Sequence, residues 1–207
     1  VDFAGQSDSV LYDNQDYRRS IIDDLGSKKL KTMAKEILGQ SPINYGAELF
    51  AKPPKTGLRV PEHQDNYYWA IDDANALTFW ISLNSSSKKN GGIYYYKGSH
   101  KLGLLEHKPS FAPGSSQTIK YPDGMSYFKR ITPTLKPGDC VIHNVLVVHG
   151  SKPNQSDLSR MGWTVRYISK NSKKNKEQQK KYMRELKMQL KQRKLARIWI
   201  NRQIGSE

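Results

Sequence analysis

The first apolar pattern along the chain has the period of an α-helix and covers residues 16–38. Apolar side chains three or four positions apart lie on one face of a helix, and here they are Ile21, Ile22, Leu25, Leu30, Met33, Ala34 and Ile37. Gly26 and Ser27 interrupt the pattern, and Gly39 follows it in a position suited to a C-terminal cap. The pattern therefore predicts a helical N-terminal region, with two helices packed against the outside of a sheet.

From residue 45 onwards the pattern changes to that of β-strands. Short runs of β-branched and aromatic residues alternate with segments rich in Gly, Pro, Asn and Ser. These runs predict strands at residues 47–50, 76–83, 93–96, 140–143, 145–148 and 163–168. Residues 100–130 have weak periodicity, and we expect a long excursion there. Many short strands separated by turns favour a mainly β fold with flanking helices, built as a double sheet of the jelly-roll type.

The last part of the chain predicts a basic helix within residues 171–204. It carries twelve Lys and Arg against two acidic residues, so it holds +10 of the net charge of +15. One interpretation is a solvated helix whose stripe of Tyr182, Leu186 and Leu190 packs on the domain or on a second subunit in a homo-oligomer. The other is an electrostatic handle for nucleic acid or an anionic surface. No recognised nucleic-acid motif accompanies it, which disfavours nucleic acid as a partner.

The candidate chemistry begins at His63 and Asp65. Side chains two apart on an extended strand point to the same side, so this pair would present an imidazole and a carboxylate together. Two histidines and one carboxylate form the facial triad that holds Fe(II) and leaves open positions. His149, at the end of an apolar run, is the best candidate for the third ligand. Arg160 follows eleven residues later and is suited to a bidentate grip on a carboxylate.

Each of these residues has an alternative interpretation. Most His-x-Asp triplets bind no metal, and a histidine that ends an apolar strand is usually a packing residue. His143 is a rival ligand, six residues before His149 in a predicted strand. Arg166 is the rival of Arg160, because residues six apart on a regular strand face the same side. Spacing from His149 favours Arg160, which leaves Arg166 a structural or substrate-binding role.

The ordered set, with its flanking stretches, resembles the phytanoyl-CoA dioxygenase (PhyH-like) family of Fe(II)/2-oxoglutarate-dependent oxygenases. The resemblance covers residues 45–168 and rests on residues 63–69 (HQDNYYW), 90–92 (NGG), 98–101 (GSHK), 137–139 (PGD) and 149–154 (HGSKPN). It implies a double-stranded β-helix core, which is a cupin-like jelly roll. It also implies Fe(II) bound by His63, Asp65 and His149, and 2-oxoglutarate as co-substrate bound by Arg160, Ser151 and Trp80.

The resemblance further implies the activity. The expected reaction is hydroxylation of an unactivated C–H bond by dioxygen, with release of succinate and CO₂, and the expected substrate is a small, polar metabolite. Related halogenases lack the carboxylate, so Asp65 favours hydroxylation over halogenation. One alternative is a superfamily oxygenase that acts on nucleic acid or protein and is docked by the basic C-terminal helix. Another is a binding protein that kept the barrel without turnover.

Length and cysteine usage set the remaining expectations. The 207 residues fit one oxygenase domain at residues 1–170 and a basic helical extension at residues 171–207. Cys140 is the single cysteine, so no disulfide forms within the chain. No run is apolar enough for a membrane span and no signal-peptide pattern opens the chain, so we predict a cytoplasmic protein without membrane association. The chain starts with Val1, which is compatible with a processed or truncated product.

Overall fold

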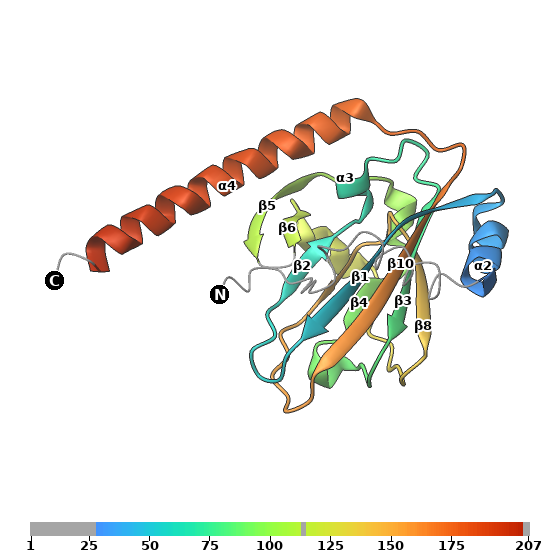
Figure 1. The fold of residues 1–207 in the computed structure, drawn as a ribbon, viewed down its shortest axis with the longest axis horizontal. Helices are drawn as coiled ribbons and strands as arrows, with labels where there is room; N and C mark the ends of the chain where they lie inside the picture. The colour runs from blue at the N-terminus through green and yellow to red at the C-terminus, as the bar shows by residue number, and fades with distance from the viewer. Residues whose placement is uncertain (1–27, 113–114, 205–207) are drawn as a thin grey trace.

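The protein folds around two antiparallel sheets. The computed structural model describes residues 28–112 and 115–204, and the first predicted helix lies outside these residues. One sheet has the strand order β1-β10-β3-β8 and the other β2-β9-β4-β7, while β5 and β6 form a separate hairpin (Figure 1). The strands are β1 (Pro42–Lys52), β2 (Val60–His63), β3 (Ala76–Ser82), β4 (Ile93–Tyr96), β5 (His107–Ala112), β6 (Ser115–Ile119), β7 (Arg130–Ile131), β8 (Cys140–Asn144), β9 (His149–Ser151) and β10 (Arg160–Ser169).

Helix α2 (Lys28–Leu38) covers the outer face of the first sheet (Figure 1). Its buried Ala34 and Leu38 pack against a cluster from the sheet that comprises Leu77, Phe79, Trp163, Val165 and Tyr167. Gly39 follows the helix with φ +66°, a conformation that suits glycine at the end of a helix. The second predicted helix, its cap and its packing against the sheet are therefore confirmed.

Alternation along β10 gives the first sheet two different faces. Trp163, Val165 and Tyr167 point outward into the cluster under α2, so the residues between them point toward the second sheet. Arg160, Thr164 and Arg166 lie on this inner face and line a pocket between the two sheets. Alternate residues of β10 therefore pack in the outer hydrophobic cluster, and the residues between them line the pocket.

Several strand predictions need correction. Strand β1 is longer than the predicted 47–50, because it pairs with β10 from Pro42↔Ser169 to Lys52↔Arg160. Residues 145–148 are not a strand: Asn144 accepts a hydrogen bond from the backbone of Leu146 at 2.8 Å, and a turn follows β8. The excursion at residues 100–130 contains the β5–β6 hairpin, β7 and the short 3₁₀ helix η3 (Pro122–Tyr127). Two more 3₁₀ turns are η1 (Lys88–Asn90) and η2 (Ser99–Leu102).

The long helix α4 (Lys176–Ile204) crosses above the short helix α3 (Asn66–Trp69) and the β5–β6 hairpin (Figure 1). The predicted packing stripe is wrong in part, because Leu190 is 55% exposed whereas Gln189 is buried. The inner face is formed by Tyr182, Glu185 and Gln189, whose polar groups bond the body of the protein. Within the described residues, no helix combines the length and apolar character needed to span a membrane.

Candidate active site

The two predicted histidine ligands are brought together by strand pairing. His63 ends β2 and His149 begins β9, and the two residues are direct partners in the antiparallel register. Directly opposed side chains in such a pair lie on the same face and within contact distance. Their ring centroids are 4.3 Å apart. The pairing explains how two histidines 86 positions apart in the sequence reach one site.

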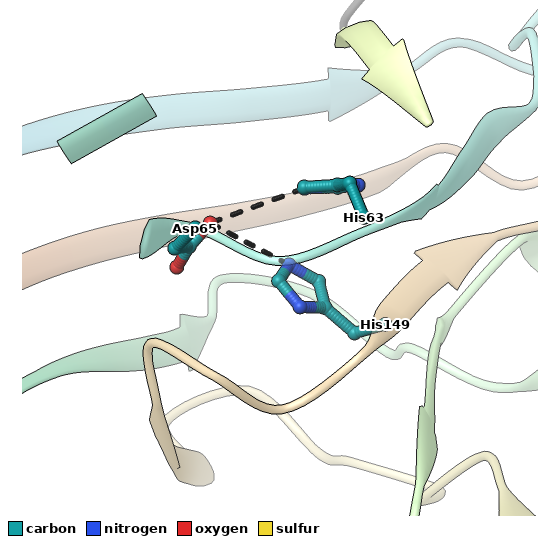
Figure 2. Close-up of side chains that lie close together, drawn as sticks. All are labelled: His63, Asp65 and His149. Atoms are coloured by element: carbon teal, nitrogen blue, oxygen red, sulfur yellow. Dashed lines mark ion pairs between the residues drawn. The ribbon is translucent and has the colours of Figure 1, made fainter. Parts of the chain in front are cut away.

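Asp65 reaches the same site by a route that the sequence did not predict. Strand β2 ends at His63, and Asp65 has helical backbone angles (φ −56°, ψ −36°) at the N-cap of α3. Its Oδ1 atom lies 3.9 Å from Nε2 of His63 and 3.7 Å from Nε2 of His149 (Figure 2). The expectation of a shared face is met, but through a strand end and a helix start rather than through one extended strand.

The hydrogen bonds of both imidazoles leave a ring nitrogen free for a metal. Nδ1 of His63 lies 2.8 Å from the carbonyl oxygen of Pro61, and Nδ1 of His149 lies 2.9 Å from that of Val147. When Nδ1 donates to a carbonyl, Nε2 carries the lone pair that binds metals. Burial lowers the pKa of His63, and burial lowers the pKa of His149 to about 3, so both rings are neutral.

The donor set fits a metal ion of the iron type. The ligand atoms of His63, Asp65 and His149 all lie within 4.8 Å of one another and could hold one ion. Two neutral imidazole nitrogens and one carboxylate oxygen are the donors of the facial triad that binds Fe(II). All three residues line the pocket, so an ion held by them would be accessible to other ligands from the pocket.

The second oxygen of Asp65 is held by two residues from the first sheet. Thr78 on β3 donates a hydrogen bond of 3.0 Å to Oδ2, and Nε2 of His143 on β8 lies 3.3 Å from the same atom. Burial raises the pKa of Asp65, but the neighbouring imidazoles of His149, His143 and His63 outweigh it and hold the pKa well below its usual range. Asp65 is therefore ionised, with Oδ1 directed at the histidine pair. His143, the rival ligand, braces the carboxylate and does not belong to the three-residue group.

Gln64, between the two predicted ligands, fixes the backbone that carries them. Its side chain is fully buried, and its Nε2 donates to the carbonyls of Gly103 at 2.8 Å and Leu146 at 2.6 Å. Its Oε1 accepts from the backbone N–H of Leu105 at 2.8 Å, and its own N–H donates to Nε2 of His107 at 3.1 Å. These bonds tie the ligand segment to two distant loops. The sequence did not predict this role, because it depends on two loops that lie next to Gln64 only in the folded protein.

Arg160 is a buried cation whose position suits an anionic ligand. It is 3% exposed, and its guanidinium lies 5.4 Å from the ring of Trp80. Within residues 28–112 and 115–204, no carboxylate lies within ion-pair distance of Arg160, and the buried Nε atoms of Arg160 and Trp80 lack partners. Burial lowers its pKa to about 10, and burial together with the charge of Arg160 lowers the pKa of Lys52 to about 7. A bound carboxylate would relieve both effects.

The site residues line one pocket of about 490 Å³ between the sheets. Ser151, two residues after His149, lines it together with Trp80 and Arg160, so the six residues predicted from the sequence share one cavity. Arg166 also lines it but is paired with Glu48 on β1. Of the two rivals on β10, Arg160 is therefore the one with no carboxylate within ion-pair distance among the described residues.

Other pocket residues went unpredicted although their signals were partly visible. Thr78 stands two before Trp80 on β3, and the period of 2 could have placed it on the inner face. Tyr182 and Arg193 of α4 also line the pocket. The apolar stripe marked Tyr182 only as a packing residue and did not mark Arg193, because their place at the pocket depends on how α4 crosses the hairpin.

Comparison with known proteins relates this arrangement to curated relatives. The chain is 26% identical over 147 residues to a probable alpha-ketoglutarate-dependent hypophosphite dioxygenase from Stutzerimonas stutzeri, a match that covers 69% of this chain and 51% of the relative. It is 29% identical over 143 residues to phytanoyl-CoA dioxygenase domain-containing protein 1 from Bos taurus, with 67% of this chain and 49% of the relative covered. The chain spans about half the length of these curated relatives.

Solved structures share the fold. EvdO2 from Micromonospora carbonacea var. aurantiaca, solved in complex with 2-oxoglutarate, aligns with a TM-score of 0.62 at 20% identity over 77% of this chain and 67% of its own. SnoK, a non-heme alpha ketoglutarate dependent carbocyclase from nogalamycin biosynthesis, gives a TM-score of 0.60 at 24% identity, covering 70% of this chain and 56% of its own. The family model of phytanoyl-CoA dioxygenase (PhyH) matches residues 2–162, well over half of the sequence. The chain therefore belongs to the phytanoyl-CoA dioxygenase (PhyH) family.

Proposed function

We propose that this protein is an Fe(II)/2-oxoglutarate-dependent dioxygenase that hydroxylates an unactivated C–H bond of a small, polar metabolite. The proposal rests on one observation: a possible metal site and a buried cation line the same pocket. The metal site is formed by the ligand atoms of His63, Asp65 and His149, and the cation is Arg160. Membership of the PhyH family supports the same chemistry.

His63, Asp65 and His149 would hold the iron through Nε2, Oδ1 and Nε2. The bound iron and 2-oxoglutarate would supply activation of dioxygen, with succinate and CO₂ as the other products. The residues around the ligands keep the donors ready: the carbonyls of Pro61 and Val147 fix the imidazole tautomers, and Thr78 and His143 hold Asp65. The chain's own part in the reaction is to position these groups and to exclude water from them.

Arg160 would bind the distal carboxylate of 2-oxoglutarate. The guanidinium can donate two parallel hydrogen bonds to a carboxylate, and the buried environment strengthens them. Ser151 would add a hydroxyl donor from β9, and Trp80, whose buried Nε1 has no hydrogen-bond partner, would pack against the co-substrate. In this arrangement Arg166 and Glu48 satisfy each other and leave the co-substrate to Arg160.

The architecture and organisation of the chain form part of the proposal. The two four-stranded antiparallel sheets would be the halves of a double-stranded β-helix, with the metal ligands at its open end. Residues 1–170 would form the oxygenase domain and residues 171–207 an extension. Action on nucleic acid or protein is the alternative, in which α4 docks the macromolecule. A cytoplasmic location and a homo-oligomer stay predictions.

The test is an anaerobic titration of the protein with Fe(II) and 2-oxoglutarate, followed by the weak visible charge-transfer band of the chelate. We expect the band in the wild type, its loss in His149→Ala, and a roughly 10- to 100-fold higher 2-oxoglutarate requirement in Arg160→Met. His100→Ala, which removes an exposed histidine, serves as the control and should match the wild type. A wild type without the band under saturating conditions would refute the proposal.

A further inference from the structure

Helix α4 forms part of the wall of the pocket although it lies beyond the residues matched to the family model. The match to the family model ends at residue 162, and α4 begins at Lys176. Tyr182 and Arg193 nevertheless line the same cavity as His63 and Asp65. This part of the wall is therefore contributed by a segment beyond the residues matched to the family model.

Specific hydrogen bonds fix α4 in this position. The hydroxyl of Tyr67 donates to Oε2 of Glu185 at 2.7 Å, and Nε2 of Gln189 donates to the carbonyl of Ser116 at 2.9 Å. Gln189 is 2% exposed, which is unusual for a glutamine on a highly basic helix. A helix held only by its charge would have a solvated polar face instead. The inner face of α4 is thus built to dock on α3 and the β5–β6 hairpin.

A row of rings connects α4 to the metal ligands. The ring of Tyr182 lies 5.3 Å from that of Tyr68 in an edge-on contact, and the ring of Tyr68 lies 5.9 Å from that of His63. Tyr68 belongs to α3, which starts directly after Asp65. A molecule that contacts Tyr182 is therefore two ring contacts away from a metal ligand, a separation that a small metabolite can span.

Among the described charged residues that line the pocket, one cation has no anionic partner once iron and 2-oxoglutarate are counted. Glu48 neutralises Arg166, the 2-oxoglutarate carboxylate would neutralise Arg160, and the 2-oxoacid end with Asp65 would balance Fe(II). Arg193 remains, and no carboxylate of residues 28–112 or 115–204 lies within ion-pair distance of it. Its guanidinium donates to the carbonyl of Phe111 at 2.9 Å and has further donors to offer.

We propose that α4 is the substrate-recognition wall of this enzyme and that Arg193 binds the carboxylate of a small organic acid. The apolar part of the acid would lie against Tyr68 and Tyr182, with the C–H bond to be hydroxylated directed at the metal ligands. A single leftover positive charge matches a monoanion better than a doubly charged phosphate ester. This inference rests on the proposed function and names its substrate class.

The test measures binding of chemically matched probes to the anaerobic Fe(II)/2-oxoglutarate protein by calorimetry and by perturbation of the chelate band. The probes are straight-chain carboxylates of four to eight carbons, with the alcohol, amine and phosphate monoester of each length. We expect the carboxylates to bind best. Arg193→Gln should weaken their binding on the order of tenfold to a hundredfold, because a charge-assisted pair is lost. Lys191 is exposed on the same helix, as Arg193 is, but it does not line the pocket, so Lys191→Gln should leave carboxylate binding unchanged.

Arg193→Glu provides the second variant and should reverse the preference, so that the amine of the favoured length binds and the carboxylate does not. All three variants should keep the wild-type chelate band and 2-oxoglutarate affinity. Equal effects of Arg193→Gln and Lys191→Gln would overturn the assignment, as would equal binding of acids and alcohols, preferential binding of the phosphate esters, or no binding of any acid to a wild type that shows the band. A wild type without the band refutes the proposed function itself, so the two failures are distinct.

Discussion

Replacing Arg160 by methionine should make the ligand-free protein more stable while removing its affinity for 2-oxoglutarate. Burial lowers the pKa of Arg160 from 12.5 to about 10. At neutral pH this difference costs the folded state about 3 kcal/mol, at about 1.4 kcal/mol per pKa unit. The contact with Trp80 returns roughly 0.5–2 kcal/mol. Methionine has a similar length and no charge to bury, so the expected net gain is about 2 kcal/mol.

Thermal and urea unfolding of metal-free, ligand-free protein measure this gain. For a chain of this size, about 2 kcal/mol corresponds to a Tm higher by roughly 4–8 °C. Addition of Co(II) and 2-oxoglutarate should then raise the Tm of the wild type, since a ligand at 100 times its Kd adds about 2.7 kcal/mol. The rise in Arg160→Met should match that with Co(II) alone. The order of stability is therefore expected to reverse when the co-substrate is present.

Arg166→Met is the matched control, because Arg166 lines the same pocket but is paired with Glu48. Its removal leaves a largely buried carboxylate without a partner, which should cost roughly 1–3 kcal/mol. The two arginine variants are thus expected to change stability in opposite directions. If Arg160→Met destabilises the ligand-free protein as much as Arg166→Met does, Arg160 is not an unpaired cation awaiting an anion, and its assignment to 2-oxoglutarate fails.

Three further outcomes follow from single contacts. Gly162→Ala should cost roughly 1–3 kcal/mol in urea unfolding and weaken 2-oxoglutarate binding, because an added Cβ would lie 2.0 Å from the ring of Trp80. Thr78→Val, which removes the 3.0 Å hydrogen bond to Asp65, should lower Co(II) affinity about 10- to 100-fold in a visible-absorption titration. Burial lowers the pKa of His107 from 6.5 to about 4, so its contribution to stability is complete above pH 6.5 and is lost as the pH falls toward 4, by up to about 1.4 kcal/mol per pH unit. Urea titrations over this range should show a smaller pH dependence for His107→Asn than for the wild type.

The residues of the candidate metal site could be named from the sequence because each has a local signal, although the pairing of β2 with β9 is what brings the two histidines together. His63 and Asp65 are two apart where β2 ends, and the extended backbone up to His63 together with the turn into α3 directs both side chains to one place. His149 was identified by its place at the end of an apolar run before Gly150, which is where β9 begins. Arg160 was identified by spacing, and the inner face of β10 then brings it into the pocket.

Other features depend on distant contacts and could not be predicted. The backbone of Asp65 is helical because α3 starts there, and the short run that follows has no helical period long enough to signal it. Residues 145–148 are apolar like a strand, but they form the turn that carries the chain from one sheet to the other. His143 looked like a rival ligand because its type and strand are right. Its position beside Oδ2 of Asp65 results from the pairing of β8 with β3 and could not be predicted from the sequence of β8 alone.

The basic segment shows most clearly where composition and contacts disagree. Its net charge of +10 favours a solvated helix, and the outer face of α4 is exposed over residues 176–195. The face of α4 that packs on the body of the protein carries Glu185 and Gln189. Both are polar, so apolar periodicity does not identify this face. Among the basic side chains that the structure describes there, Arg193 lines the pocket. In the proposed substrate site, α4 therefore contributes the charge of one residue, Arg193, which lies at the pocket because of the way α4 crosses the hairpin. The other positive charges on the helix need a separate explanation.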